Sequence, residues 1–147
     1  MDDVARLFLE RQRLAHLATV DASGAPHVVP VCFALVGATV YVSIDDKPKK
    51  SHDPRRLKRL RNIAANPRVA IVSDVYDDAD WSRLGFVLLR GVARVVESTV
   101  DEHAEAVRQL RARYPQYRAM ALDDRPLIAA DITSVTTWGR LEGEAAR

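Results

Sequence analysis

The sequence lacks the residues and runs that several common classes of protein require. It has a single cysteine, Cys32, which excludes a disulfide within the chain and a multi-cysteine zinc site. Its longest apolar run, residues 28–36, is interrupted by Pro30 and falls far short of a membrane span. No basic-then-apolar leader opens the chain, so a cytoplasmic location without membrane attachment is expected.

Motifs of several enzyme classes are also missing. There is no glycine-rich dinucleotide fingerprint and no phosphate-binding loop. Ser43 and Ser134 lack the flanking glycines of a nucleophile elbow, so a triad hydrolase has no support. No metal-ligand spacing connects the four histidines, which are His16, His27, His52 and His103. An enzyme that lacks all these motifs would depend on a cofactor for its chemistry.

What the sequence does contain is the composition of one globular domain, expected to cover residues 1–147. Hydrophobic residues make up 48% of the chain and charged residues 29%. The formal net charge of +2 argues against a general nucleic-acid binder. Residues 47–61, however, hold eight basic side chains and one acidic one, a local charge of +7 that leaves −5 elsewhere. This basic segment suggests a local anionic partner.

Hydrophobic periodicity and turn residues predict a mainly β fold with some helix. Strands are expected over residues 16–20, 26–35, 39–44, 68–75, 85–96 and 127–138. Helices are expected over residues 2–14, 53–66 and 99–114. Short turns separate successive strands and β–α–β units are absent. The pattern therefore favours a small barrel of about six mostly antiparallel strands with peripheral helices.

Several local features of these elements can be compared with a structure. In the first helix, Val4, Leu7, Phe8 and Leu14 are expected to face the core. In the third, Thr99 and a glutamate three residues later form a capping-box pattern. Two single residues complete the list: Gly91 marks a bulge within its strand, and Cys32 is expected to be inert core.

The second expected helix breaks a local rule. Asp53 and Pro54 form a helix start, which places Arg55 and Arg56 in the first turn, where the helix dipole is already positive. A helix N-terminus surrounded by cations binds phosphate well, so the conflict is typical of a functional site. A solvated basic face is the alternative interpretation.

The order of five segments resembles that of the pyridoxamine-phosphate-oxidase-like split β-barrel family of flavin and deazaflavin proteins. The segments are His16-Leu17-Ala18-Thr19-Val20, Gly24-x-Pro26-His27-Val28-Val29-Pro30-Val31, Val40-Tyr41-Val42-Ser43, Lys58-Arg59-Leu60-Arg61-Asn62-Ile63 leading into Asn66-Pro67-Arg68-Val69-Ala70, and Gly91-Val92-Ala93-Arg94-Val95-Val96-Glu97. The resemblance covers residues 14–97, with a plausible final strand at 127–138, and it implies a split β-barrel fold.

The resemblance also implies a cofactor site. In the family a basic pair eight or nine residues before the Asn-Pro-Arg turn holds the cofactor phosphate, and this pair maps to Lys58 and Arg59. A hydroxyl at the end of the preceding strand maps to Ser43, and Arg61 lies nearby. The strand along the tricyclic ring is the one that carries Val29, Pro30 and Val31.

Two departures favour one branch of the family over another. Oxidases that use flavin mononucleotide (FMN) carry basic residues where this chain has Val29 and Ala34. The branch that uses the deazaflavin coenzyme F420 lacks them too, and its cofactor ends in a polyglutamate tail, for which Lys49 and Lys50 in an inserted segment are candidates. Residues 74–81 are similar to a loop of a deazaflavin-dependent subgroup, and Trp81 is a candidate to cover the ring or the substrate from a partner subunit.

The resemblance therefore implies an F420-dependent oxidoreductase that transfers hydride from reduced deazaflavin to an unsaturated small molecule. It also implies a homodimer, while the net charge and the short apolar runs predict neither nucleic acid nor membrane as partner. An FMN-dependent oxidoreductase of the same family is one alternative. A non-enzymatic module that binds flavin, deazaflavin or haem is another. An ordinary interface aromatic is the alternative role for Trp81.

Overall fold

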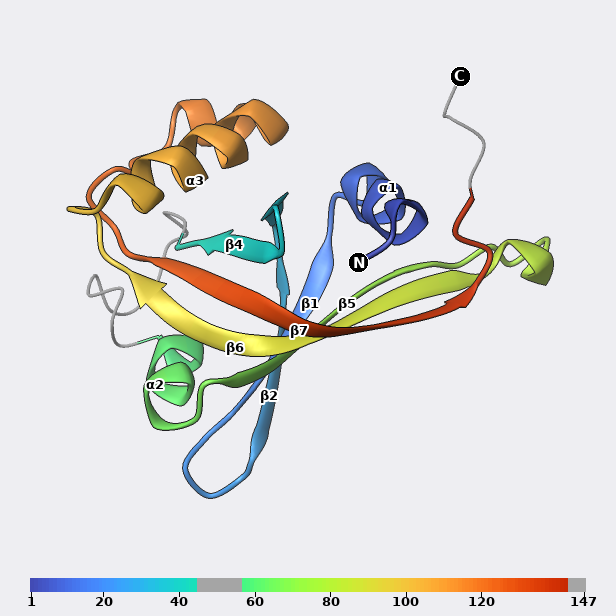
Figure 1. The fold of residues 1–147 in the computed structure, drawn as a ribbon, viewed down its shortest axis with the longest axis horizontal. Helices are drawn as coiled ribbons and strands as arrows, with labels where there is room; N and C mark the ends of the chain where they lie inside the picture. Colours follow the sequence, from blue (N-terminus) through green and yellow to red (C-terminus); the bar gives the residue numbers. More distant parts are fainter. Residues whose placement is uncertain (45–56, 143–147) are drawn as a thin grey trace.

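A computed structural model describes residues 1–44 and 57–142 of the chain (Figure 1). The three helices are α1 (Asp3–Arg11), α2 (Lys58–Ala65) and α3 (Asp101–Arg113), and two 3₁₀ turns are η2 (Trp81–Arg83) and η3 (Pro115–Arg118). The seven strands are β1 (Ala15–Val20), β2 (Pro26–Val31), β3 (Ala34–Val36), β4 (Thr39–Ser43), β5 (Arg68–Val75), β6 (Gly85–Val96) and β7 (Leu127–Gly139). Strands dominate, as the sequence predicts.

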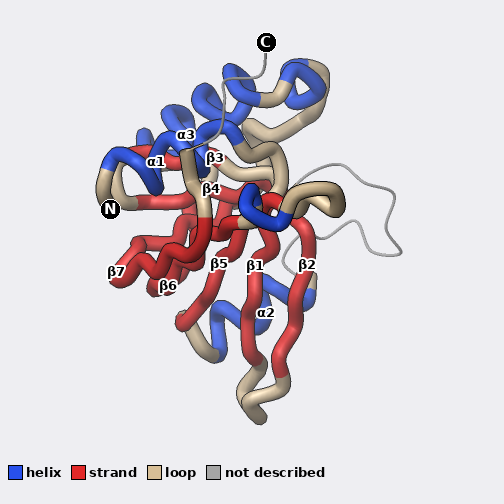
Figure 2. Tube along the Cα trace, turned by 90° about the vertical axis from the view of Figure 1, so that its right-hand side faces the viewer, coloured by secondary structure: helices blue, strands red, loops and turns tan. Residues whose placement is uncertain are grey.

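All seven strands form one antiparallel sheet in the order β2-β1-β5-β6-β7-β4-β3. The sheet curls around its core, and Figure 2 shows its two edges approaching each other. Only Cys32 and Phe33 link β2 at one edge to β3 at the other. The fold is thus a split β-barrel, as expected.

The single strand expected over residues 26–35 is wrong, which is why there are seven strands and not six. β2 pairs with β1, whereas β3 pairs with β4 at the opposite edge, so the chain must leave one strand before joining the other. At this crossing the backbone N–H and C=O of Phe33 both bond the hydroxyl of Tyr114. Cys32 is half-buried against the second of the two hydrophobic clusters, and its thiol is free.

A bulge interrupts the long β6–β7 pairing, as the glycine in β6 predicts. Arg90 lies opposite Ser134, but Gly91 lies opposite Ile132, so Thr133 is the extra residue. A Cβ atom on Gly91 would lie 2.3 Å from the carbonyl oxygen of Asp131, which only glycine avoids.

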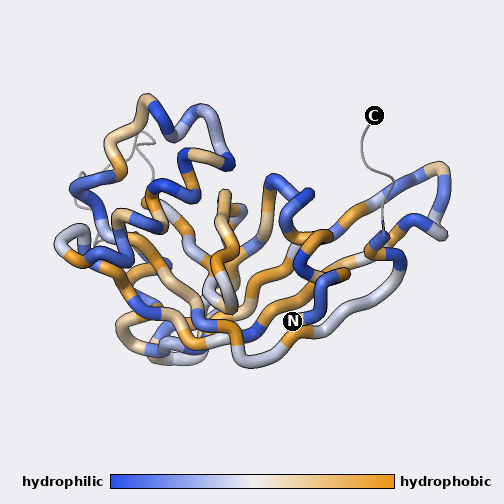
Figure 3. Tube along the Cα trace, turned by 45° about the horizontal axis from the view of Figure 1, so that its top comes forward, coloured by the Kyte–Doolittle hydropathy of each residue, from blue (hydrophilic) through white to orange (hydrophobic). Residues whose placement is uncertain are grey.

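Two hydrophobic clusters stabilise the fold (Figure 3). The first fills the barrel, where Leu17 and Val87 from the sheet meet Phe8 of α1 and Leu60 of α2. The second lies between α3 and the outside of β4 and β7, around Leu110. The two clusters therefore place α1 and α2 against the barrel interior and α3 against another face of the sheet.

The apolar face expected for α1 is only partly correct. Asp2 caps the helix by accepting a 2.8 Å hydrogen bond from Ala5 N, as predicted. The buried residues are Ala5, Phe8 and Leu9, however, while Val4, Leu7 and Leu14 are exposed. Helix α1 therefore buries a narrower stripe than its apolar residues could cover.

Two helix starts differ from the sequence prediction. Leu57 has extended backbone, so α2 begins at Lys58, and Asp53 to Arg56 lie outside the described residues. Helix α3 has Val100 at its N-cap with no side-chain cap, so the capping box is wrong. The carboxylate of Glu102 bonds Arg94 and Tyr41 and does not turn back to the helix backbone. Among the described ranges, no helix is both long and apolar enough to cross a bilayer.

Candidate cofactor site

The candidate site begins at α2, which carries three cations and no acidic residue. Lys58 and Arg59 are its first two residues, so both lie in the turn whose backbone N–H groups are unpaired within the helix. Lys58 and Arg61 are exposed, and Arg59 is half-buried. The structure thus brings the predicted basic pair to a helix N-terminus, where the dipole adds positive potential. Lys49 and Lys50 lie outside the described residues.

Helix α2 is held against the β1–β2 hairpin by two polar contacts that the sequence does not reveal. Nδ2 of Asn62 donates a 2.9 Å hydrogen bond to Oγ1 of Thr19, and both side chains are buried. Nζ of Lys58 lies 3.3 Å from Oδ2 of Asp21 at the end of β1. Together with the apolar contacts of Leu60 and Ile63, these bonds fix where the cations of α2 lie.

Asp21 also shapes the turn beneath α2. Its Oδ1 accepts hydrogen bonds from the hydroxyl and backbone N–H of Ser23 and from Ala25 N. Chiefly the Ser23 hydroxyl, then the Ala25 N–H, holds the pKa of the Asp21 carboxyl far below its usual value, and Lys58 adds to this. The carboxylate is therefore charged at neutral pH and places one negative charge beside Lys58.

The three predicted ring-contacting residues of β2 do not share one face. Val31 is buried and Val29 packs against the barrel core, whereas Pro30 is exposed. Pairing across the sheet places Pro30 in a row on the outer face, the side away from the barrel interior. That row comprises Pro30, His16, Val72, Leu88 and Thr136. Only Pro30 of the three is thus available to a ligand on the outer face.

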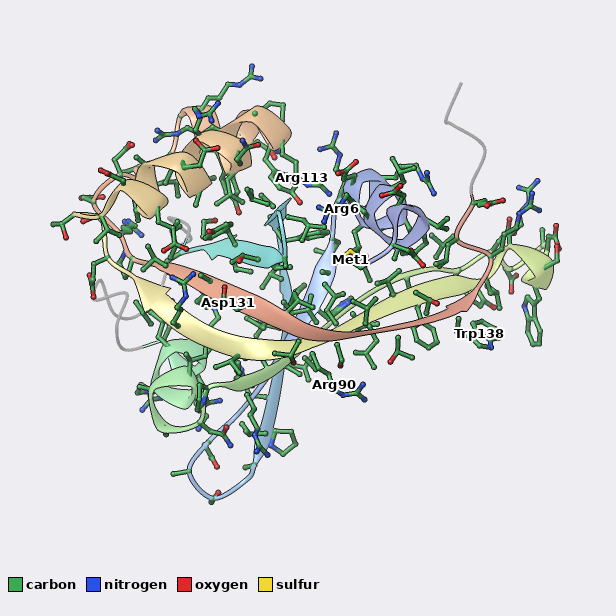
Figure 4. All side chains as sticks on the ribbon, in the orientation of Figure 1. Met1, Arg6, Arg90, Arg113, Asp131 and Trp138 are labelled. Atoms are coloured by element: carbon green, nitrogen blue, oxygen red, sulfur yellow. The ribbon has the colours of Figure 1, made fainter. Side chains whose placement is uncertain are left out.

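The next row of this outer face is made mostly of small side chains. It comprises Val28, Ala18, Ala70, Arg90 and Ser134. Figure 4 shows Arg90 pointing away from the sheet on the side opposite α1 and α3, the side to which Trp138 also points. The bulge lies directly beside Arg90. Sequence reasoning missed Arg90, because nothing local distinguishes it from a surface arginine.

The predicted phosphate contact Ser43 lies on a different face from α2. Its hydroxyl is buried and has no hydrogen-bond partner among residues 1–44 and 57–142. Strand alternation places Ser43 with Tyr41, toward α3, whereas Val42 and Ile44 enter the same core as Leu60 of α2. No described contact joins Ser43 to Lys58 or Arg59, and its role stays a prediction.

A charged network near Ser43 is fully paired. Arg94 of β6 donates to Glu102 and Asp131 at 2.6–2.9 Å, and the Tyr41 hydroxyl donates to Glu102 at 2.8 Å. Burial first, and then the Glu102 carboxylate, raises the pKa of Tyr41 to about 12. These groups connect α3 to β4, β6 and β7 and leave little capacity for a ligand, so we assign the network a structural role.

Trp81 lies far from α2 within one chain. It begins the η2 turn between β5 and β6, at the end of an arm that projects beyond the barrel (Figure 1). Its side chain is 70% exposed. Helix α2 lies at the other end of β5, so any contact between Trp81 and the cations of α2 requires a second molecule. Within the described part of the chain, no cluster of histidine, cysteine or carboxylate side chains could hold a metal.

One curated relative shares part of the sequence. The chain is 34% identical over 89 residues to a 5a,11a-dehydrotetracycline/5a,11a-dehydrooxytetracycline reductase of Streptomyces rimosus. The match covers 60% of this chain and 59% of the relative, so it spans about three-fifths of the relative's length.

Solved structures with the same fold include enzymes and binding proteins. A conserved hypothetical protein from Mycobacterium tuberculosis superposes with a TM-score of 0.75 at 18% identity, covering 95% of this chain and 85% of that one. An F420 reductase gives a TM-score of 0.63 at 24% identity, covering 92% and 98%. A haem storage protein from Vibrio cholerae gives 0.68 at 20% identity, covering 91% and 90%. At these identities the likeness concerns the fold alone.

The match to a family model extends over nearly the whole chain. The model described as pyridoxamine 5'-phosphate oxidase matches residues 1–139, which include all seven strands and the three helices. The matched region contains the split barrel, the cationic α2 and the projecting arm. The chain therefore belongs to the pyridoxamine 5'-phosphate oxidase family.

Proposed function

We propose that this protein is an oxidoreductase that uses the deazaflavin coenzyme F420 to reduce an unsaturated small molecule. The observation that carries the proposal is the first turn of α2, where Lys58 and Arg59 lie at a helix N-terminus docked on the β1–β2 hairpin. Such a turn suits a phosphate, because charge-assisted hydrogen bonds and the helix dipole act on the same oxygens. The family membership and the reductase relative support the same class of reaction.

The described residues fit an anionic cofactor, and they favour deazaflavin over FMN. The two strand positions at which FMN oxidases carry basic residues hold Val29 and Ala34, and both pack into hydrophobic clusters of this chain. A basic side chain at either position would need a different packing. An FMN-dependent oxidoreductase is therefore the second candidate, and haem binding, named for two proteins of the same fold, is the third.

In the proposed mechanism the chain binds and orients, and the cofactor carries the redox chemistry. Reduced deazaflavin would supply a hydride when bound. Arg59 and Lys58 would hold its phosphate, with Arg61 adding positive potential. The hydrogen bond between Asn62 and Thr19 holds α2 in place. Pro30 and its outer-face neighbours Val72 and Leu88 offer apolar side chains for a ring. We assign no proton donor to this face.

A titration with each cofactor tests the proposal. The purified protein is titrated with F420, FMN and haem, whose absorbance spectra are distinct, and F420 is expected to bind most tightly. Arg59→Ala should weaken F420 binding about tenfold to a hundredfold, the value of one or two charge-assisted phosphate contacts. Arg118→Ala, on an exposed residue of η3, is the matched control and should leave affinity unchanged.

The outcomes separate the candidates. Preferential binding of FMN would transfer the assignment to the FMN-dependent alternative, and preferential binding of haem would transfer it to the non-enzymatic one. Equal affinity of the Arg59→Ala variant and the unmodified protein for F420 would reject α2 as the phosphate site. A circular dichroism spectrum of each variant checks that its secondary structure matches that of the unmodified protein.

A further inference from the structure

A cavity lies between α1 and α3, at the end of the sheet that β3 forms. Its volume is about 390 Å³, within the range of small-molecule binding sites. We call it the edge cavity, and its lining includes Ala34 and Leu35 of β3, Glu10 and Arg13 at the end of α1, and Gln109 and Arg113 of α3. Figure 1 and Figure 2 show α1 and α3 on one side of the molecule and α2 on the other, so the edge cavity is separate from the candidate cofactor site.

The edge cavity opens on the backbone of β3. Ala34 belongs to the hydrophobic cluster beneath α3, whereas Leu35 packs against the cluster inside the barrel. Successive side chains of a strand point to opposite faces of the sheet, so a cavity lined by both residues reaches the edge of the strand between those faces. Because β3 is the last strand of the sheet, its backbone has no neighbouring strand on that side.

The hydrogen-bond pattern of the β3–β4 hairpin directs one residue of β3 toward the edge cavity. The turn residues Gly37 and Ala38 separate Val36 from its partner Thr39. In a hairpin with a two-residue turn, the pair that flanks the turn is hydrogen-bonded and the next pair is not. The N–H and C=O of Leu35 therefore point away from β4 and out of the sheet.

The same alternation points Phe33 and Gly37 outward on either side of Leu35, and each of them already has a partner. The Tyr114 hydroxyl bonds the N–H and C=O of Phe33, and Arg6 donates to the carbonyl of Gly37 at 2.8 Å. The backbone of Leu35 has no such partner among residues 1–44 and 57–142. A donor and an acceptor left open together at a sheet edge are what an added strand pairs with.

A positive charge beside this open edge adds a second requirement for a ligand. Nη1 of Arg13 donates to the carbonyl of Arg113 at 2.7 Å, and the guanidinium carbon of Arg13 lies 5.8 Å from the centre of the Tyr114 ring. These contacts hold Arg13 at the edge cavity, and within the described ranges its other N–H groups make no hydrogen bond. Arg113, which Figure 4 shows reaching from α3 toward α1, adds positive potential. A carboxylate suits Arg13, because the planar guanidinium can bind both of its oxygens.

We propose that the edge cavity binds a short peptide with a free C-terminal carboxylate. The last residue of the peptide pairs with Leu35 as an antiparallel strand does. Its N–H donates to the C=O of Leu35, and its carboxylate accepts from the N–H of Leu35 and from the guanidinium of Arg13. The volume of about 390 Å³ suits a small ligand such as a dipeptide or tripeptide.

Glu10 limits which peptides bind well. It is the one acidic side chain among the described lining residues, and it is exposed and makes no ion pair in the described part of the chain. A second carboxylate on the peptide would be repelled by it, so small or apolar side chains are preferred to acidic ones. The proposal goes beyond the proposed function and does not depend on it, because none of these contacts involves a cofactor.

Three ligands test the geometry in the unmodified protein. Alanyl-alanine is titrated into ¹⁵N-labelled protein, and the amide resonance of Leu35 is expected to shift because its N–H gains a partner. Alanyl-alanine amide lacks the carboxylate and should bind about tenfold more weakly, the value of one charge-assisted hydrogen bond. Alanyl-N-methylalanine lacks the donor to the C=O of Leu35 and should bind about fivefold more weakly.

Two variants test the charges. Arg13→Met should weaken the binding of alanyl-alanine about tenfold and leave that of alanyl-alanine amide unchanged. Arg118→Met, at an exposed position of η3, is the matched control and should change neither. Glu10→Gln should raise the affinity for alanyl-glutamate about threefold relative to alanyl-alanine, because the repulsion is lost.

Three results would overturn the proposal. The first is an amide resonance of Leu35 that does not move at millimolar alanyl-alanine. The second is equal affinity for the free, amidated and N-methylated peptides. The third is an Arg13→Met variant that loses the same affinity for the free peptide and for its amide. None of these titrations contains F420, so peptide binding and cofactor binding can fail independently.

Discussion

At the scale of single residues, Asp21 places a negative charge beside the cation that is proposed to bind a phosphate. Its Oδ2 lies 3.3 Å from Nζ of Lys58, while its Oδ1 organises the β1–β2 turn. Asp21 thus positions Lys58 and also repels an anion that approaches it. The turn uses Oδ1 and the contact with Lys58 uses Oδ2, so a substitution can remove the charge beside Lys58 and keep the turn.

Asp21→Asn removes the charge and keeps the Oδ1 that accepts from Ser23 and Ala25. F420 affinity should rise about two- to fivefold at low salt, because one repulsive charge near the phosphate is lost. The gain should disappear at about 1 M salt, where the Debye length is about 3 Å. Binding titrations at several salt concentrations measure this. A loss of affinity would show instead that the tether on Lys58 dominates.

Asn62 joins α2 to β1 through its buried hydrogen bond with Thr19, a contact that its neighbours in sequence do not indicate. Asn62→Ala leaves the Thr19 hydroxyl buried without its partner and should lower the free energy of unfolding by about 1–3 kcal/mol. Urea denaturation followed by circular dichroism measures the change. The double variant Thr19→Val with Asn62→Leu removes both polar groups and should recover part of the loss. If Asn62→Ala leaves the free energy of unfolding unchanged, the hydrogen bond between Asn62 and Thr19 does not hold α2 against the sheet.

The residue scale also shows what the sequence could and could not predict about the site. Family resemblance and local charge both single out Lys58 and Arg59, and their role in holding a phosphate stays a prediction. Asn62 was missed because its partner Thr19 is 43 residues away, and a mid-helix asparagine usually faces solvent. Arg90 was missed because nothing in its local sequence distinguishes it from other surface arginines.

At the scale of elements, Arg94 joins α3 to the sheet through Glu102 and Asp131. Its hydrogen bonds are the main cause that lowers the pKa of both carboxyls from ordinary values of 4.5 and 3.8. A carboxyl with a lowered pKa in the folded protein stabilises it above the ordinary pKa. That stabilisation is lost as the pH falls through the lowered value.

The free energy of unfolding should therefore decrease as the pH falls below about 4.5, and Arg94→Met should flatten this dependence. The Arg94 side chain is 44% exposed, so the expected difference at neutral pH is only on the order of 1 kcal/mol. Unfolding curves from pH 3 to 7 measure it, and the two proteins should converge at the acidic end. Parallel pH profiles would contradict the role of Arg94.

The elements themselves were predicted unevenly, for physical reasons. The bounds of β5 and β6 match the prediction, because polar turns and alternating burial mark both ends. The break between β2 and β3 was missed, because an apolar run carries no mark of a change in pairing partner. The capping box of α3 was wrong because Arg94 of β6 binds the Glu102 carboxylate, so it does not turn back to the helix backbone.

At the scale of the whole molecule, Arg113 connects α3 to α1 and to the crossing between β2 and β3. Its guanidinium donates to the carbonyls of Leu9 and Glu10, in the last turn of α1, and of Gln12, the C-cap residue. It also lies 4.9 Å from the centre of the Phe33 ring. One side chain thus binds carbonyls at the C-terminal end of a helix that lies more than 100 residues earlier in the chain.

Arg113→Met keeps most of the side-chain volume and removes these bonds. We expect a loss of about 2 kcal/mol of stability and faster amide hydrogen exchange in α1, because three carbonyls lose a charged donor. Exchange in β5 and β6 should change less than in α1. Arg118→Met, at an exposed position, serves as the control. Uniformly faster exchange across the sheet would mean that Arg113 stabilises the barrel as a whole and not α1 in particular.

The position of β7 in the sheet has a consequence for how the molecule folds. β7 is the last of the seven strands along the chain, yet in the sheet it lies between β6 and β4. β4 therefore gains its neighbour only when β7 has been made, and Thr39 of β4 contacts Asp131 of β7, 92 residues later in the chain. β1 and β2, in contrast, can form a hairpin early. Non-local pairing of this kind slows the search for the native topology, which suggests folding in milliseconds to seconds. Until β7 docks, the facing edges of β4 and β6 stay open, and this interval is when the nascent chain is most prone to aggregate.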